Sequence, residues 1–117
     1  MNPAYTVKSS GDFRRMYAKG KSAASSHVVV YCRKNSLGRN RTGYTVSKKL
    51  GHAVIRNRVR RQLREIYRLN SASFRQGYDI IIIARMKCAG ADYYVIEKSF
   101  LDACSHLRLL TENEVKA

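Results

Sequence analysis

The pattern of apolar and polar positions is most regular between residues 48 and 70. At about 100° per residue, five apolar side chains of this segment fall within one arc of about 120°. These are Ile55, Val59, Leu63, Ile66 and Tyr67. The opposite side carries the polar residues Asn57, Arg60, Arg61, Arg64 and Arg68. The segment is therefore predicted to be an amphipathic helix that ends near Asn70, with one face in a core and the other in solvent.

Residues 28–33 and 78–85 show the patterns of two kinds of strand. The first segment is rich in β-branched residues, and its alternation places Tyr31 and Arg33 on one face. Residues 78–85 contain four consecutive isoleucines, which is typical of a central strand covered on both faces. A further strand is predicted around residues 44–47, and we expect it to pair antiparallel with residues 28–33.

Two more helices are predicted, one near each end of the chain. Residues 9–19 begin with Ser9, which can cap a helix, and Gly20 can terminate it. Asp92 can cap a longer helix that runs to about residue 110. The apolar residues of this helix are spaced for burial on one side. They are Ile96, Phe100, Ala103, Leu107 and Leu110.

The order of these elements predicts the fold class. A strand, the basic helix and a strand follow one another over residues 43–85, which is a βαβ unit. We therefore expect an α+β fold with a mixed sheet packed by three helices. A chain of 117 residues, 44% of them hydrophobic, suits one domain that buries roughly two-thirds of its unfolded surface. Residues 1–117 are predicted to form that single domain.

The positive charge is concentrated around the amphipathic helix. Residues 33–68 hold 12 basic and one acidic side chain, which is +11 of the chain's net charge of +15. Arginine predominates in this segment, and its planar guanidinium group matches phosphate oxygens and base edges. Such a patch attracts a polyanion and is costly to maintain without one because of self-repulsion. A membrane surface is the weaker alternative, since no exposed Trp or Phe stripe remains for insertion.

Other features argue against several functional classes. Cys32, Cys88 and Cys104 are odd in number and widely spaced, so they are interpreted as buried or incidental thiols and not as a disulfide framework or zinc site. The three histidines are isolated, and no paired carboxylates or metal-ligand cluster appears, so no catalytic residue is expected. Because the first residues do not resemble a signal peptide and no apolar run could span a bilayer, we expect a cytoplasmic protein.

The aromatic residues of the first predicted helix can be interpreted in two ways. Phe13, Met16 and Tyr17 share one side of the first predicted helix, which usually indicates core packing. Alternatively, with Tyr31 and the neighbouring arginines, this helix and the sheet could form two walls of a groove. Aromatic and cationic side chains together suit single-stranded nucleic acid, in which each stacked base contributes about 1–3 kcal/mol.

Residues 47–64 carry a more specific pattern, SKKLGHAVIRNRVRRQLR. Ser47, the two lysines, Gly51, Ala53, Val54, the Arg56-Asn57-Arg58 run, Arg61 and Arg64 resemble the signature of the bacterial ribonuclease P protein subunit. The resemblance extends to Asp12, Phe13, Tyr17 and Gly20 of the first predicted helix, to Val30 and Tyr31, and to residues 78–85. Two positions depart from the family pattern: Tyr17 stands where Phe is common, and His52 where many members have Asn.

The resemblance implies a small α/β sandwich whose basic helix connects parallel strands by a left-handed crossover, against the usual right-handed rule. It implies a protein that binds a large catalytic RNA and the single-stranded 5′ leader of precursor tRNA, while the RNA performs the hydrolysis with Mg²⁺. The residues expected to contact the RNA subunit are Lys48, Lys49, Arg56, Asn57, Arg58, Arg61 and Arg64. Those expected to contact the leader are Phe13, Tyr17 and Tyr31.

Two other classes of protein share the basic patch. A ribosomal or other structural RNA-binding protein explains the charge, but not the Arg-Asn-Arg run together with the aromatic residues. A DNA-binding regulator could place the arginine helix in a major groove. However, a helix-turn-helix protein has a short helix before its recognition helix, and here a strand is predicted at that position. The identity of any RNA that co-purifies with the protein would distinguish these classes.

Overall fold

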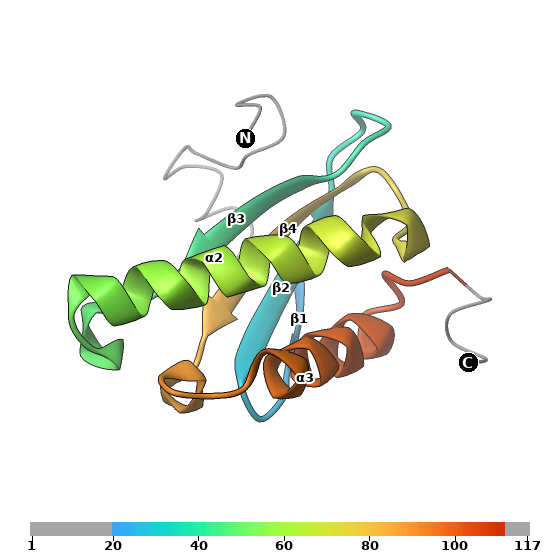
Figure 1. Cartoon of the computed structure of the whole chain (residues 1–117). Helices are drawn as coiled ribbons and strands as arrows, with labels where there is room; N and C mark the ends of the chain where they lie inside the picture. Colours follow the sequence, from blue (N-terminus) through green and yellow to red (C-terminus); the bar gives the residue numbers. More distant parts are fainter. Residues whose placement is uncertain (1–19, 112–117) are drawn as a thin grey trace.

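The computed structural model describes residues 20–111, in which four strands form one sheet and two long helices lie on the same side of it (Figure 1). The strands are β1 (Lys21–Ala24), β2 (Val28–Lys34), β3 (Arg41–Thr45) and β4 (Tyr78–Ala84). The helices are α2 (Ala53–Asn70) and α3 (Tyr93–His106), and the 3₁₀ turns are η2 (Lys48–Leu50), η3 (Ser71–Ser73) and η4 (Met86–Cys88). No helix within these residues is both long and apolar enough to cross a membrane.

The sheet has the order β1-β2-β4-β3, with β4 antiparallel to β2 and parallel to β3. The predicted mixed sheet, the α+β class and the central position of the isoleucine strand are confirmed. The prediction that β2 and β3 pair with each other is wrong, because β4 lies between them. A strand with apolar residues on both faces gains most from a central place in the sheet, where each edge also has a partner.

The structure differs from the sequence analysis at both ends of the described region. β1 was missed because its four residues, KSAA, are short and lack an apolar alternation. α3 ends at His106 and not near residue 110, because Arg108 has a left-handed φ of 58°. The predicted helix over residues 9–19 lies outside the described residues, so a third helix stays a prediction, as does the handedness of the crossover.

The core lies between the helices and one face of the sheet. Alternate residues of β2 and β4, such as Val30 and Ile82, point into it and are fully buried. The buried stripe of α2 is formed by Val59, Leu63 and Ile66, as the apolar pattern predicted. From α3 come Ile96, Phe100, Ala103 and Cys104, and the predicted N-cap Asp92 is confirmed, since its side chain accepts a hydrogen bond from the Tyr94 N–H at 3.1 Å.

The other residues of the strands point to the second face of the sheet, away from α2 and α3. Because residues directly opposite each other across paired strands share a face, the register forms rows on this side. One row is Tyr31, Ile81 and Gly43, and the next is Arg33, Asp79 and Arg41. The second face of the sheet therefore combines an aromatic ring with three charged side chains in adjacent rows.

Candidate nucleic-acid interface

The 3₁₀ turn η2, which precedes α2, carries two lysines. The Ser47 side chain accepts a hydrogen bond from the Lys49 N–H at 3.1 Å and so caps η2, which leaves Lys48 and Lys49 exposed. Gly51 then adopts a φ of +146°, and a Cβ at this position would lie 3.0 Å from Cδ1 of Ile55. Only glycine suits this turn, because it supplies both the backbone conformation and the space.

The solvent side of α2 and the preceding turn η2 carry a set of exposed, mostly cationic side chains, which we call the basic face. It consists of Lys48, Lys49, Asn57, Arg58, Arg61 and Arg64, all of which are exposed. Among residues 20–111, no carboxylate pairs with any of the cations in this set; the carboxylate of α2, Glu65, instead accepts hydrogen bonds from Arg68. A phosphate that reaches these guanidinium groups would therefore not have to break an ion pair with a carboxylate of residues 20–111.

Arg56 differs from the other residues of the predicted RNA-binding set. It is half-buried, and its Nε donates a hydrogen bond to the Gly51 carbonyl at 3.2 Å. At 100° per residue, position 56 lies beside Val59 and Leu63 on the helix surface, so Arg56 does not share the solvent side with Arg61 and Arg64. Arg56 thus ties the first turn of α2 to the preceding glycine turn, and part of its role is structural.

A pocket of about 590 Å³ opens between β3 and the second half of α2. Its aromatic residues are Tyr44 and Tyr67, and three arginines, Arg39, Arg64 and Arg68, also line it. The guanidinium carbon of Arg64 lies 5.9 Å from the centre of the Tyr44 ring, within the range of a cation–π contact. We call this the β3–α2 pocket. Sequence analysis missed it, because its residues come from a loop, a strand and a helix that no motif links.

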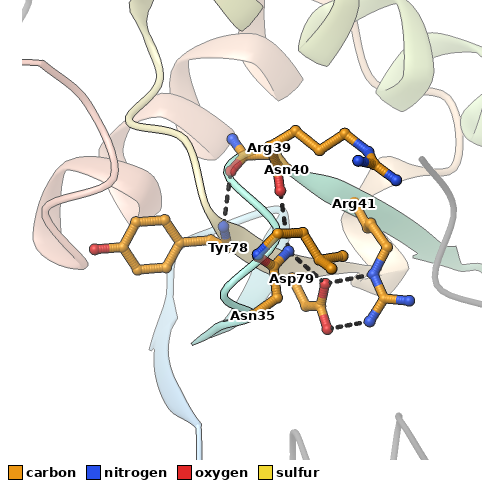
Figure 2. Close-up of polar contacts among 7 residues, drawn as sticks. Asn35, Arg39, Asn40, Arg41, Tyr78 and Asp79 are labelled. Atoms are coloured by element: carbon orange, nitrogen blue, oxygen red, sulfur yellow. Dashed lines mark hydrogen bonds and ion pairs between the residues drawn. The ribbon is translucent and has the colours of Figure 1, made fainter. Parts of the chain in front are cut away.

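Asn40 lines the β3–α2 pocket and links the elements that surround it. Its buried amide nitrogen donates to the Tyr67 hydroxyl at 3.1 Å and to the Arg75 carbonyl at 2.9 Å. Its side-chain oxygen accepts from the Tyr78 N–H at 2.9 Å (Figure 2). The loop before β3 is thereby fixed to the start of β4 and to α2. Asparagine satisfies all three contacts because it offers both donors and an acceptor.

The two tyrosine hydroxyls of the pocket remain protonated at neutral pH. Burial raises the pKa of Tyr44 to about 12, an effect that exceeds the opposing hydrogen bond with Thr42. Burial likewise raises the pKa of Tyr67. Each ring therefore presents a neutral hydroxyl group, which can donate a hydrogen bond to a ligand.

On the second face of the sheet, a buried carboxylate organises the charged row. Asp79 is fully buried, and its two oxygens accept hydrogen bonds from Nε and Nη2 of Arg41 at 2.8 and 2.6 Å (Figure 2). The Asn35 amide donates a third at 2.9 Å. Burial opposes ionisation of Asp79, but these hydrogen bonds and the charges of Arg41 and Arg33 outweigh it, so its pKa lies below the ordinary value.

Tyr31 lies on this same face, in the row next to Asp79, and is half-buried. It is the predicted leader-binding residue that the structure describes, since Phe13 and Tyr17 lie outside residues 20–111. Tyr31 and the basic face are on opposite sides of the sheet. Of the two predicted groups of RNA-binding residues, the described member of the leader group, Tyr31, therefore lies across the sheet from the basic face.

The described residues contain no group of three or more His, Cys, Asp or Glu side chains that could hold a metal ion. The prediction that the cysteines are buried thiols is confirmed: all three are free and buried, and burial raises the pKa of Cys88 to about 11. The side chain of His27 contacts Ser26, and that of His106 contacts the backbone carbonyl of Asp102 in its own helix.

The fold and the site define a class of small basic α+β proteins, with an arginine-rich helix that links two parallel strands. The ribonuclease P family model matches residues 1–108, and the chain belongs to this family. It is 40% identical to the ribonuclease P protein component of Natranaerobius thermophilus over 98% of this chain and 100% of that protein. Among solved structures, the RNase P protein of Staphylococcus aureus is 34% identical with a TM-score of 0.84, over 92% of this chain and 98% of that chain. The RNase P protein of Thermotoga maritima is 32% identical with a TM-score of 0.77, over 83% of this chain and 92% of that chain.

Proposed function

We propose that this chain is the protein subunit of ribonuclease P and binds the catalytic RNA subunit through the basic face of α2. Family membership supports a role in an RNA-processing endoribonuclease. The observation that carries the proposal is the row of exposed arginines without carboxylate partners in the described residues, beginning at the Arg-Asn-Arg run. Lys48, Lys49, Asn57, Arg58, Arg61 and Arg64 contact the RNA in this proposal, and Arg56 supports them from the helix edge.

We further propose that the 5′ leader of precursor tRNA binds the second face of the sheet, where Tyr31 stacks with an unpaired base. Phe13 and Tyr17 are proposed to complete this site. Stacking on an aromatic ring tolerates any base, which suits a leader of variable sequence. A protein with two binding surfaces on opposite sides of one sheet can bridge a large RNA and its substrate.

In this proposal, the hydrolysis belongs to the RNA and its Mg²⁺ ions, and the protein contributes binding and orientation in the cytoplasm. Its cations offset the charge of two RNA molecules that must approach each other, so the protein lowers the Mg²⁺ concentration that the reaction requires. Binding the leader also favours precursor over mature tRNA as the ligand.

Reconstitution with a bacterial ribonuclease P RNA tests the proposal. At limiting Mg²⁺, the protein should stimulate cleavage of precursor tRNA at the mature 5′ end, and the protein alone should not cleave. Arg61→Ala should weaken binding to the RNA, whereas Lys98→Ala, which removes an exposed cation from α3, should not. Site-specific cleavage by nuclease-treated protein without RNA would contradict the assignment of chemistry to the RNA. Preferential co-purification of ribosomal RNA would favour a structural RNA-binding protein instead.

A further inference from the structure

The β3–α2 pocket is a preformed site next to the basic face. Its volume of about 590 Å³ falls within the range of about 300–1,000 Å³ that is typical of small-molecule sites. A phosphate group alone would leave most of this space empty. The pocket also offers the aromatic rings of Tyr44 and Tyr67, which a phosphate does not need and which a planar base does.

We propose that the β3–α2 pocket binds one unpaired nucleotide of the RNA subunit, with the base against Tyr44 and Tyr67 and its phosphate near Arg64. This inference rests on the proposed function, because it specifies how the same RNA is recognised beyond its backbone charge. Arg64 belongs both to the basic face and to the pocket. An RNA strand that lies along α2 could therefore turn one base inward without leaving the cationic surface.

The pocket is suited to a base because its shape is fixed before binding. The side chain of Asn40 is fully engaged with three partners, and Gln76 accepts a hydrogen bond from the Asn40 N–H at 3.1 Å while donating to the Phe74 carbonyl at 3.3 Å. These amide contacts hold the loop in place. The hydroxyl groups of Tyr44 and Tyr67 are neutral at pH 7, because burial raises pKa values that are ordinarily near 10, and they can donate to a base edge.

The position of the pocket assigns it to the RNA subunit and not to the leader. Tyr44 lies opposite Ile82, on the helix side of the sheet, whereas Tyr31 lies opposite Ile81, on the second face. A leader that stacks on Tyr31 would have to pass around the edge of the sheet to reach Tyr44. The basic face, by contrast, continues directly into the pocket through Arg64.

A blocking substitution tests the proposal. Ala72 is exposed on η3 and lines the pocket, so Ala72→Trp should fill it while leaving the aromatic and cationic residues intact. The matched control is Leu69→Trp, which adds the same side chain at an exposed position of α2 that does not line the pocket. We expect Ala72→Trp to weaken binding of a bacterial ribonuclease P RNA about tenfold or more, as for the loss of a stacked base. Leu69→Trp should bind like the unmodified protein.

Chemical probing of the bound RNA identifies what is lost. One unpaired nucleotide should be protected by the unmodified protein and by Leu69→Trp, and should become reactive in the complex with Ala72→Trp. Equal affinity of both variants, or a loss of affinity with no single nucleotide exposed, would overturn the pocket assignment. If the unmodified protein failed to bind the RNA at all, the proposed function would fail instead.

A second measurement does not depend on a variant that folds. In NMR titrations of the unmodified protein, nucleoside 5′-monophosphates should shift the backbone resonances of Tyr44, Tyr67 and Ala72 in a saturable manner. Inorganic phosphate at the same concentrations should leave these three unchanged, because it lacks the base. Identical shifts with phosphate and with all four mononucleotides would mean that the pocket recognises only charge, and would refute the proposal.

Discussion

The buried carboxylate on the second face of the sheet allows a sharp test of how this protein is held together. Asp79 is fully buried and accepts two hydrogen bonds from Arg41 and one from Asn35. Asp79→Asn keeps the size of the side chain but removes the charge. It also turns one acceptor into a donor that must face a guanidinium or amide N–H. The variant should fold less stably for this reason alone.

The size of the loss follows from the burial of the two partners. Removing one member of a fully buried ion pair costs about 3–5 kcal/mol. The side chain of Arg41 retains 23% of its exposure, so water can partly solvate the stranded guanidinium group. We therefore expect Asp79→Asn to lower the free energy of unfolding by about 2–4 kcal/mol. In a double-mutant cycle with Arg41→Met, the coupling energy should be about 1–3 kcal/mol, because the second substitution removes the stranded charge.

The effect should depend on pH in a defined direction. The hydrogen bonds and neighbouring charges, having overcome the cost of burial, hold the pKa of Asp79 below its ordinary value of 3.8. A lowered carboxyl pKa stabilises the folded state at pH values above the unfolded pKa, and this stabilisation is lost as the pH falls through the folded pKa. The difference in stability between the unmodified protein and Asp79→Asn should therefore be full at pH 6–7 and shrink below about pH 4.

Urea unfolding of the free protein, followed by circular dichroism at several pH values, measures both effects. Asp102→Asn is the matched control, because Asp102 forms an exposed pair with Lys98 at 3.4 Å and its loss should leave stability unchanged within error. Equal stability of Asp79→Asn and the unmodified protein at pH 7 would refute the argument. A difference that stays constant down to pH 3 would refute its electrostatic part.

Three further predictions concern α2 and the proposed leader site. Arg61→Ala should lower the slope of log binding constant against log salt concentration by about one, without changing thermal stability. Arg56→Ala should also lower the melting temperature, because its hydrogen bond to the Gly51 carbonyl is lost. Tyr31→Ala should cost about 1–3 kcal/mol in affinity for precursor tRNA and almost nothing for mature tRNA; a loss that follows melting temperature and ignores leader length would make this ring structural. His52 is an N-cap without a side-chain hydrogen bond, so His52→Asn should raise the free energy of unfolding by about 0.5–1 kcal/mol in urea titrations, and an unchanged value would contradict this capping argument.

Two elements could be predicted from the sequence because their local pattern matches their final environment. The apolar stripe of α2 places Val59, Leu63 and Ile66 in the core, and the isoleucines of β4 require cover on both faces. Both signals arise within a single segment and need no knowledge of its neighbours. The same holds for the capping of α3 by Asp92, which depends only on the residues that follow it.

Features that depend on distant parts of the chain could not be predicted in this way. β3 pairs with β4 and not with β2. Which strands become neighbours depends on how all the strands pack together, and no single segment encodes that. The β3–α2 pocket likewise requires Asn40 to bond to Tyr67 and to the Arg75 backbone, residues about 30 positions away. The helical pattern alone could have predicted that Arg56 is half-buried, because position 56 lies close to the apolar stripe. Its charge suggested an exposed position instead.

Asp79 also explains how a strand with so uniform a sequence keeps its register. Residues 80–83 are all isoleucine, so a shift of β4 by one residue would still present isoleucine to both faces. The same shift would carry the Asp79 carboxylate into the apolar core and away from Arg33 and Arg41, which flank it on both neighbouring strands. The cost of an unpaired buried charge forbids that arrangement. Because the register puts Tyr31 and Tyr44 on opposite faces, this carboxylate also fixes the separation of the two proposed RNA-binding surfaces.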